Sequence, residues 1–271
     1  MRAWLVLVAV VAAWPALAQD GLDRLTTRED LRGFEPVGRV DIAGGGFCTG
    51  ALIAPDLVLT AGHCILKDDG TPVAAGTITF RAGLSDGMAL AESPVRRTVV
   101  DPRFTARKPT PLEDLELDVA LLELATPIPT SVISPFVVAA PGTGDEVSVV
   151  SYAAGREEAL SWQPVCRALD RQGALLAFDC DVSFGSSGAP VLDRSHYRAR
   201  IVSIISSGST MDGRRIAIGM QLPARVAALK AALRSGRVTS EALPAEAPRT
   251  VGKRIAPGGG KDQTGARFIT P

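Results

Sequence analysis

Three short segments of the sequence contain the residue types that acyl transfer needs. They are Leu59-Thr60-Ala61-Gly62-His63-Cys64, Leu117-Asp118-Val119-Ala120-Leu121-Leu122 and Phe184-Gly185-Ser186-Ser187-Gly188-Ala189-Pro190. A serine hydroxyl is a weak nucleophile until a neighbouring base takes its proton. Histidine is the usual base, and a buried carboxylate fixes its tautomer and stabilises the imidazolium. We therefore predict Ser187 as nucleophile, His63 as base and Asp118 as the carboxylate that orients His63.

The glycine-rich turn around Ser187 also suits the second requirement of acyl transfer, an oxyanion hole. Two backbone N–H groups must point at the developing negative charge, which demands a tight turn with little side-chain bulk. Gly185 and Gly188 allow such a turn. We expect the N–H groups of Gly185 and Ser187 to form the hole. The turn is not the G-x-S-x-G elbow of α/β-hydrolases, and each segment alone is ordinary, so only their combination indicates a catalytic set.

Short β-rich runs, separated by Gly, Pro, Asp and Ser clusters, must position these residues. Strands this numerous, with almost no helical periodicity between them, indicate an all-β barrel or sandwich. The clearest runs are Phe47–Ile53, Leu57–Thr60, Thr77–Arg81, Val95–Val100, Val119–Leu124, Val147–Tyr152, Leu160–Leu169, Ala174–Phe178, Pro190–Leu192, Arg200–Ile205 and Ile216–Met220.

One C-terminal α-helix is predicted after the last strand. Pro223 suits a first helical position, Val226, Leu229 and Leu233 recur at helical spacing, and Gly236 is a typical C-terminal stop. Residues 237–271 are rich in Pro, Ala, Gly and charge, and we expect a flexible tail there.

The N-terminus resembles an export signal. Arg2 precedes an apolar run from Trp4 to Trp14 of about eleven residues, the length of a signal h-region. Ala16-Leu17-Ala18 is the small-x-small pattern of a cleavage site. A membrane anchor needs roughly 20 apolar residues, so we predict a signal peptide over residues 1–18, a secreted or periplasmic location, and no membrane association after cleavage.

The charge and the cysteines of the sequence limit which partners and cross-links can be expected. Lys plus Arg and Asp plus Glu each total 29, and the scattered cations argue against nucleic acid as a partner. The four cysteines are an even set in an exported chain, which favours disulfides. A zinc site is the alternative, but there is no C-x-x-C spacing. We expect no metal and no cofactor. The cysteines are Cys48, Cys64, Cys166 and Cys180.

The three segments together resemble the motifs of the trypsin/chymotrypsin family of serine proteases. The first is similar to T-A-A-H-C, the second to D-I-A-L-L and the third to G-D-S-G-G-P. The resemblance covers roughly residues 40–225 and extends to the bacterial branch that includes glutamyl endopeptidases. It implies two six-stranded antiparallel β-barrels, with His63 and Asp118 from the first and Ser187 from the second.

The resemblance also implies a disulfide between Cys48 and Cys64 beside the histidine, which leaves Cys166 and Cys180 to pair in the second barrel. Closing a loop of about fifteen residues contributes roughly 3 kcal/mol on the chain-entropy model. Ser186 replaces the aspartate that pairs with the freed N-terminus in the animal enzymes. We therefore predict that processing of residues 19–38 matters less here, or acts differently.

Substrate preference is predicted from the residues before and after Ser187. Asp181 falls where trypsin-like enzymes carry the acid of the primary pocket, which would favour Arg or Lys, although Asp181 could equally cap a turn. Ser203 lies in a segment resembling the strand that pairs with substrate. Ile205 would make the pocket shallow. The family's glutamyl-type branch usually has a pocket histidine, but His196 lies in a polar, exposed turn, which disfavours a glutamate preference.

The sequence thus predicts a signal peptide over 1–18, a leader or surface arm over 19–38, a protease domain over 39–236 and the tail. The two barrels would span about 39–138 and 139–236. The predicted function is a secreted serine endopeptidase acting on proteins or peptides. The alternatives are a catalytically silent relative that binds a partner, which commonly lacks a triad residue, and an esterase on the same fold.

Overall fold

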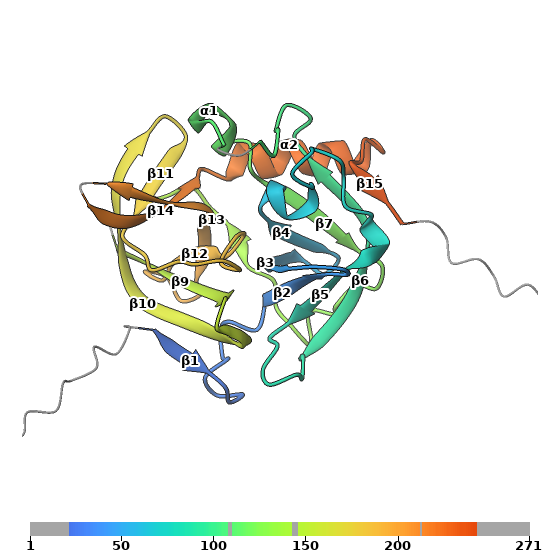
Figure 1. Ribbon diagram of the computed structural model, residues 1–271. Coiled ribbons are helices and arrows are strands. Elements are labelled where there is room, and N and C mark those ends of the chain that lie inside the picture. Colours follow the sequence, from blue (N-terminus) through green and yellow to red (C-terminus); the bar gives the residue numbers. More distant parts are fainter. Residues whose placement is uncertain (1–21, 108–109, 143–145, 212, 243–271) are drawn as a thin grey trace, which may run out of the picture.

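The computed structural model describes residues 22–107, 110–142, 146–211 and 213–242. The predicted signal peptide lies outside these residues. Most of the described chain forms strands in two closed six-stranded antiparallel β-barrels, followed by a C-terminal helix, which confirms the predicted class. Figure 1 shows the two barrels side by side.

The first barrel is a closed sheet in the order β5-β2-β3-β4-β7, with β6 pairing both β5 and β7. The period of two in its strands decides which side chains enter the barrel; in β5, for example, Ile78, Phe80 and Ala82 are buried while Thr79 and Arg81 are half-buried. Its strands are β2 (Val37–Ile42), β3 (Phe47–Ala54), β4 (Leu57–Thr60), β5 (Ile78–Ala82), β6 (Ala91–Val100) and β7 (Ala120–Leu124). Three short helices lie in its loops: η1 (Gly62–Ile65), η2 (Ala75–Thr77) and α1 (Leu112–Leu115).

The second barrel closes in the same way, through β10-β11-β14-β13-β12-β9 and a further pairing of β9 with β10. Two short strands join its outside: β1 (Asp23–Leu25) pairs with β10, and β8 (Val137–Val138) pairs in parallel with β13. Its strands are β9 (Glu146–Ala153), β10 (Arg156–Gln172), β11 (Leu175–Phe178), β12 (Pro190–Asp193), β13 (Arg200–Met211) and β14 (Arg214–Met220).

The described part of the predicted N-terminal arm packs on the second barrel. Leu25 of β1 is buried, as are Leu31 and Phe34 after it, and the Phe34 ring lies 5.3 Å from the Trp162 ring on β10. Burial of such apolar side chains favours a docked segment over a free one. Residues 22–36 therefore form a surface arm that crosses the second barrel before the chain enters the first.

Helix α2 (Pro223–Arg234) forms where the sequence predicts it, with Pro223 as its first residue. Val226, Leu229 and Leu233 are its buried residues, and they join an apolar cluster that also contains Leu121 of the first barrel. The helix returns the chain from the second barrel to the first, where α2 contacts β6 and β7.

The ordered body continues beyond Gly236, unlike the prediction of a flexible tail from residue 237. Strand β15 (Ser240–Glu241) pairs with the edge of β6, Thr239 N–H donates to the Thr98 carbonyl (2.7 Å), and Ala242 N–H donates to the Arg96 carbonyl (2.8 Å). Backbone hydrogen bonds to β6 fix this segment. The polar composition of the segment gave no indication of them. The rest of the predicted tail, residues 243–271, lies outside the described residues.

Two disulfides are present, one in each barrel. Cys48 is bonded to Cys64 and Cys166 to Cys180, which confirms both predicted pairs.

Each barrel has an apolar interior of its own, and a third cluster lies between the barrels and α2. Within the described part of the chain, no helix is both long and apolar enough to span a membrane.

Candidate active site

The first barrel brings His63 and Asp118 together. Strands β4 and β7 are paired, with Thr60 opposite Ala120, so the residue three positions after Thr60 and the residue two positions before Ala120 meet at one end of the barrel. Asp118 Oδ2 lies 2.8 Å from His63 Nδ1, and the His63 backbone N–H donates to Asp118 Oδ1 at 2.8 Å. An ionised carboxylate only accepts hydrogen bonds, so Nδ1 carries the proton and Nε2 keeps its lone pair.

Burial separates the roles that these two side chains can take. The Asp118 side chain is 2% exposed, whereas that of His63 is 31% exposed. The imidazole can therefore reach a substrate, and the carboxylate can act only through the imidazole. This arrangement suits a base oriented by a buried acid.

A further partner of Asp118, which the sequence reasoning missed, comes from the second barrel. Ser206 is buried on β13 and its hydroxyl donates to Asp118 Oδ2 at 2.5 Å. A charge-assisted hydrogen bond of this kind stabilises the ionised carboxylate. Asp118 is thus held by both barrels. The predicted strand ended at Ile205, one residue before Ser206, and the serine predicted to bind substrate was Ser203.

The turn that contains Ser187 packs tightly on the first barrel. The Thr49 N–H of β3 donates to the Ser187 carbonyl at 2.9 Å. Gly188 has a φ of +78°, and a Cβ at this position would lie 2.2 Å from Thr60 Oγ1 and 2.3 Å from the Thr49 carbonyl oxygen. Only glycine permits so close an approach. The half-buried Ser187 therefore lies against the strand end that leads into His63.

Two peptide planes fix the direction of the Gly185 and Ser187 N–H groups. The Phe184 carbonyl accepts a hydrogen bond from Ala154 N–H (2.7 Å), and the Ser186 carbonyl accepts one from Ala189 N–H (2.9 Å). In a planar trans peptide the N–H points away from its carbonyl, so both N–H groups point away from these acceptors. Within the described ranges, neither N–H donates a hydrogen bond. Two such donors can serve an oxyanion hole.

The model of the trypsin-like peptidase domain family matches residues 48–199 of this chain, which is more than half of its length. The chain belongs to this family. The matched range includes the histidine, aspartate and serine segments, and it confirms the resemblance drawn from them.

One curated relative of this trypsin-like peptidase domain is a bacterial protease. The glutamyl endopeptidase of Bacillus licheniformis is 28% identical over 155 residues, which are 56% of this chain and 47% of that protein. The chain thus spans about half the length of this curated relative.

Solved structures share the fold. A Glu endopeptidase in complex with MPD has a TM-score of 0.64 at 20% identity, covering 81% of this chain and 98% of the other. The protease Anisep from Arthrobacter nicotinovorans has a TM-score of 0.59 at 17% identity, covering 72% and 93%.

Ser186, which replaces the activation aspartate of the animal enzymes, has a neutral partner in this peptidase domain. It is fully buried, and its hydroxyl lies 3.0 Å from the Ser151 hydroxyl of β9. The anchor inside the nucleophile turn is therefore a pair of hydroxyl groups rather than a carboxylate. The expectation about the 19–38 arm stays a prediction.

The structure does not bring Asp181 and Ser203 to the site in the form expected. Asp181 is exposed, and its carboxylate lies 3.1 Å from the Arg215 guanidinium of β14. Ser203 is fully buried, and its hydroxyl donates to the Met220 carbonyl (2.8 Å) and accepts from the Met220 N–H (2.9 Å). The Ser203 side chain therefore fastens β13 to β14 inside the barrel and is closed to a substrate.

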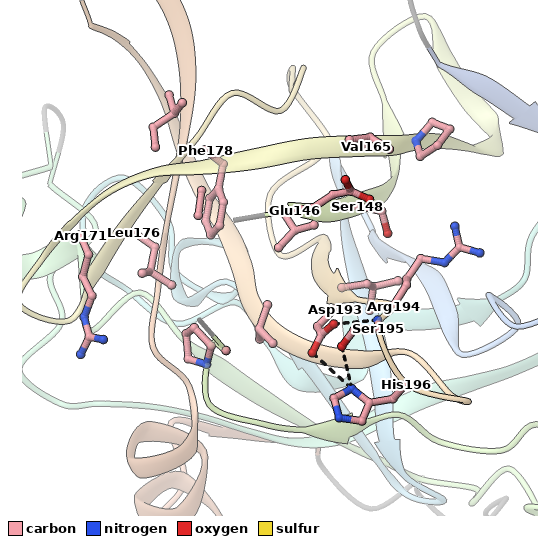
Figure 2. Close-up of a pocket in the computed structure, with 18 of the residues that line it drawn as sticks. Glu146, Ser148, Val165, Arg171, Leu176, Phe178, Asp193, Arg194, Ser195 and His196 are labelled. Atoms are coloured by element: carbon pink, nitrogen blue, oxygen red, sulfur yellow. Dashed lines mark hydrogen bonds and ion pairs between the residues drawn. The ribbon is translucent and has the colours of Figure 1, made fainter. Parts of the chain in front are cut away.

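One cavity adjoins the predicted site, and a larger one is lined by other residues. One of 590 Å³ adjoins His63 and the Cys48–Cys64 disulfide, and the glycines of the β2–β3 hairpin and Lys67 also line it. A second, of 930 Å³, lies on the second barrel beneath the β10–β11 hairpin and contains none of the predicted catalytic residues. Figure 2 shows His196 at its edge, bonded to Ser195 and paired with Asp193. His196 is exposed, as predicted.

Proposed function

We propose that this protein is a serine endopeptidase that cleaves peptide bonds through an acyl-enzyme on Ser187. The observation that carries the proposal is the His63–Asp118 pair, with a partly exposed imidazole and a buried carboxylate, beside the docked Ser187 turn. Membership of the trypsin-like peptidase family supports it.

The proposed reaction has two balanced halves. Ser187 Oγ attacks the peptide carbonyl while His63 Nε2 takes the hydroxyl proton. The imidazolium, stabilised by Asp118, then gives this proton to the leaving amine as the C–N bond breaks. In the second half, water attacks the ester, His63 takes its proton and returns it to Ser187 Oγ, and the acid product leaves. The N–H groups of Gly185 and Ser187 would stabilise both tetrahedral oxyanions.

The cavity beside His63 would receive the leaving-group side of the substrate. Its 590 Å³ volume is enough for one or two side chains. Because the His63 imidazole lines this cavity, it would deliver the proton to the leaving amine at the rim of the cavity.

The predicted preference for Arg or Lys rests on Asp181, and Arg215 weakens it. A guanidinium 3.1 Å away already balances the carboxylate, so a basic substrate side chain gains less from it than from an unpaired acid. We expect a small Arg or Lys preference in the wild-type protein. Arg215→Ala should increase it, and Asp181→Ser should abolish it.

A secreted or periplasmic location agrees with the two disulfides, which persist in oxidising compartments. Together with the apolar run at residues 4–14, they support export of the protein.

Cleavage-site profiling on a peptide library tests the function. The wild-type protein should cleave internal peptide bonds, and Ser187→Ala and His63→Ala should each lose activity by a factor on the order of 10⁶. Specific binding of peptides without cleavage would favour the silent binding protein, and turnover of esters alone would favour the esterase. Equal cleavage after Arg or Lys in the wild type and Asp181→Ser would exclude Asp181 as a pocket acid.

A further inference from the structure

Thr49 contacts the second barrel through both its backbone N–H and its hydroxyl group. It is completely buried in β3 of the first barrel. Its N–H donates to the Ser187 carbonyl at 2.9 Å. Its hydroxyl donates to the Gly185 carbonyl at 2.8 Å and accepts from the Tyr152 N–H at 3.0 Å. The Tyr152 carbonyl is farther from the hydroxyl, at 3.4 Å, so the hydroxyl donates its proton to the Gly185 carbonyl.

These contacts involve the two residues whose N–H groups point into the proposed oxyanion hole. Gly185 has a φ of +94°, a conformation that an L-residue rarely adopts, and the Phe47 ring closes off its other side. A glycine in such a conformation has several alternatives of similar energy. External hydrogen bonds must therefore select the one in which its N–H faces the substrate.

The second barrel holds the turn through neutral groups, including a hydrogen bond from the Gly188 N–H to the Ile205 carbonyl at 2.7 Å. The Ser186 hydroxyl lies 3.0 Å from the Ser151 hydroxyl and accepts from the Ser183 N–H at 3.4 Å, whereas an ion pair would hold the turn more strongly. The Phe184 carbonyl is held by Ala154 N–H, one residue after the strand that Thr49 also bonds through Tyr152. Thr49 thus joins the nucleophile turn and the end of β9 in one network.

We propose that Thr49 is a positioning residue, which sets the oxyanion hole in the second barrel from the first barrel. The inference rests on the proposed endopeptidase function. The Thr49 hydroxyl holds the Gly185 carbonyl and the Thr49 N–H holds the Ser187 carbonyl, so the peptides that directly follow the two proposed oxyanion donors are fixed from the first barrel. It does not touch the substrate, so its effect falls on transition-state stabilisation rather than on substrate binding.

The test compares Thr49→Val, which keeps the shape and removes the hydroxyl, with Thr49→Ser, which keeps the hydroxyl. Thr98→Val is the matched control, because Thr98 is also a fully buried first-barrel threonine and its hydroxyl has no hydrogen-bond partner among the described residues. Two rates are measured: peptide cleavage, and inactivation by a fluorophosphonate, whose phosphoryl oxygen occupies the oxyanion hole.

In Thr49→Val we expect kcat and the inactivation rate to fall tenfold or more, with KM changed less than threefold, since loss of one oxyanion donor costs about 10²–10³ in kcat. Thr49→Ser should stay within threefold of the wild type, and Thr98→Val should match it. Equal rates in Thr49→Val and the wild type would overturn the inference alone. So would equal losses in Thr49→Val and Thr49→Ser.

A wild-type protein that neither cleaves peptides nor reacts with the probe would overturn the proposed function, and the role of Thr49 with it. If Thr49→Val does not fold, Thr49→Ala and Thr49→Ser are compared at reduced temperature. A folded Thr49→Ala with full inactivation rate would contradict the proposal.

Discussion

The two barrels share an architecture but differ in how they present their functional residues. In the first barrel, His63 and Asp118 extend from paired strands and bond each other directly. In the second, Ser187 lies in a turn outside the strands, and its carbonyl accepts a hydrogen bond from Thr49 of the other barrel. The first barrel is also covered by α2 and β15, whereas the second carries β1 and β8 on its outside.

This difference shows that the site depends on docking of the barrels as well as on their folding. Thr49 and Thr60 of the first barrel contact the Ser187 turn, and Ser206 of the second contacts Asp118. Changes at these crossing contacts should reduce activity more than equivalent changes inside either barrel.

Among the contacts between the barrels, the largest effect is expected at Gly188. In Gly188→Ala the new Cβ would meet backbone and a buried hydroxyl at 2.2–2.3 Å, so the turn must leave the first barrel. We expect at least a hundredfold loss of peptide cleavage and a loss of about 3 kcal/mol in the free energy of unfolding. Gly155→Ala is the control, because Gly155 has a φ of +77° but open space around it. It should cost about 1–2 kcal/mol from backbone strain alone. Equal activity losses in the two variants would contradict the tight docking of the turn.

The two disulfides should separate stability from activity. Each closes a loop of similar size, with sequence separations of 16 and 14, so each double Cys→Ala variant should lose about 3 kcal/mol of unfolding free energy. Only Cys48–Cys64 joins the residue before Thr49 to the residue after His63. Its removal should lower kcat at a temperature where both variants remain folded, and removal of Cys166–Cys180 should leave kcat within threefold. Denaturant unfolding and cleavage rates measure both effects.

Ser206 and Ser203 allow a contact between the two barrels to be compared with a contact inside one barrel. Ser206 bonds Asp118 of the first barrel, whereas Ser203 bonds Met220 of its own barrel. Ser206→Ala removes a hydrogen bond to a buried carboxylate, worth about 1.5–3 kcal/mol, so kcat should fall tenfold or more. Ser203→Ala should lower stability by about 1 kcal/mol and leave KM unchanged. A raised KM in Ser203→Ala would restore the prediction that Ser203 contacts the substrate.

The sequence predicted the triad candidates and most strands because their signals are local. His63, Asp118 and Ser187 each lie within a short motif, and alternation of apolar residues marks strands such as β5. Ser206 was missed because β13 has an irregular register between Ile205 and Ser207, and one extra residue in a strand exchanges its two faces. The partner of Asp181 was missed because Arg215 lies 34 residues away. Contacts between strands of distant sequence cannot be predicted from spacing.

The smallest effect is expected from a partly exposed ion pair between β6 and β7 of the first barrel. Hydrogen bonding to Arg97, and then to Arg96, holds the pKa of Glu123 below its ordinary value of 4.5, against the opposing effect of burial. A lowered folded-state pKa gives stability that is present above pH 4.5 and is lost as the pH falls through the folded-state value. Glu123→Gln should therefore lose about 1 kcal/mol at pH 7 and show a weaker pH dependence of unfolding below pH 4.5. An unchanged acid profile would contradict this pairing.

The most direct test of the endopeptidase account is the site at which a fluorophosphonate reacts with the folded protein. Intact-mass analysis followed by peptide mapping should find one adduct, on Ser187. The adduct should be absent from Ser187→Ala and form at least a hundredfold more slowly in His63→Ala. An adduct on another residue, or none on the folded wild-type protein, would contradict the account.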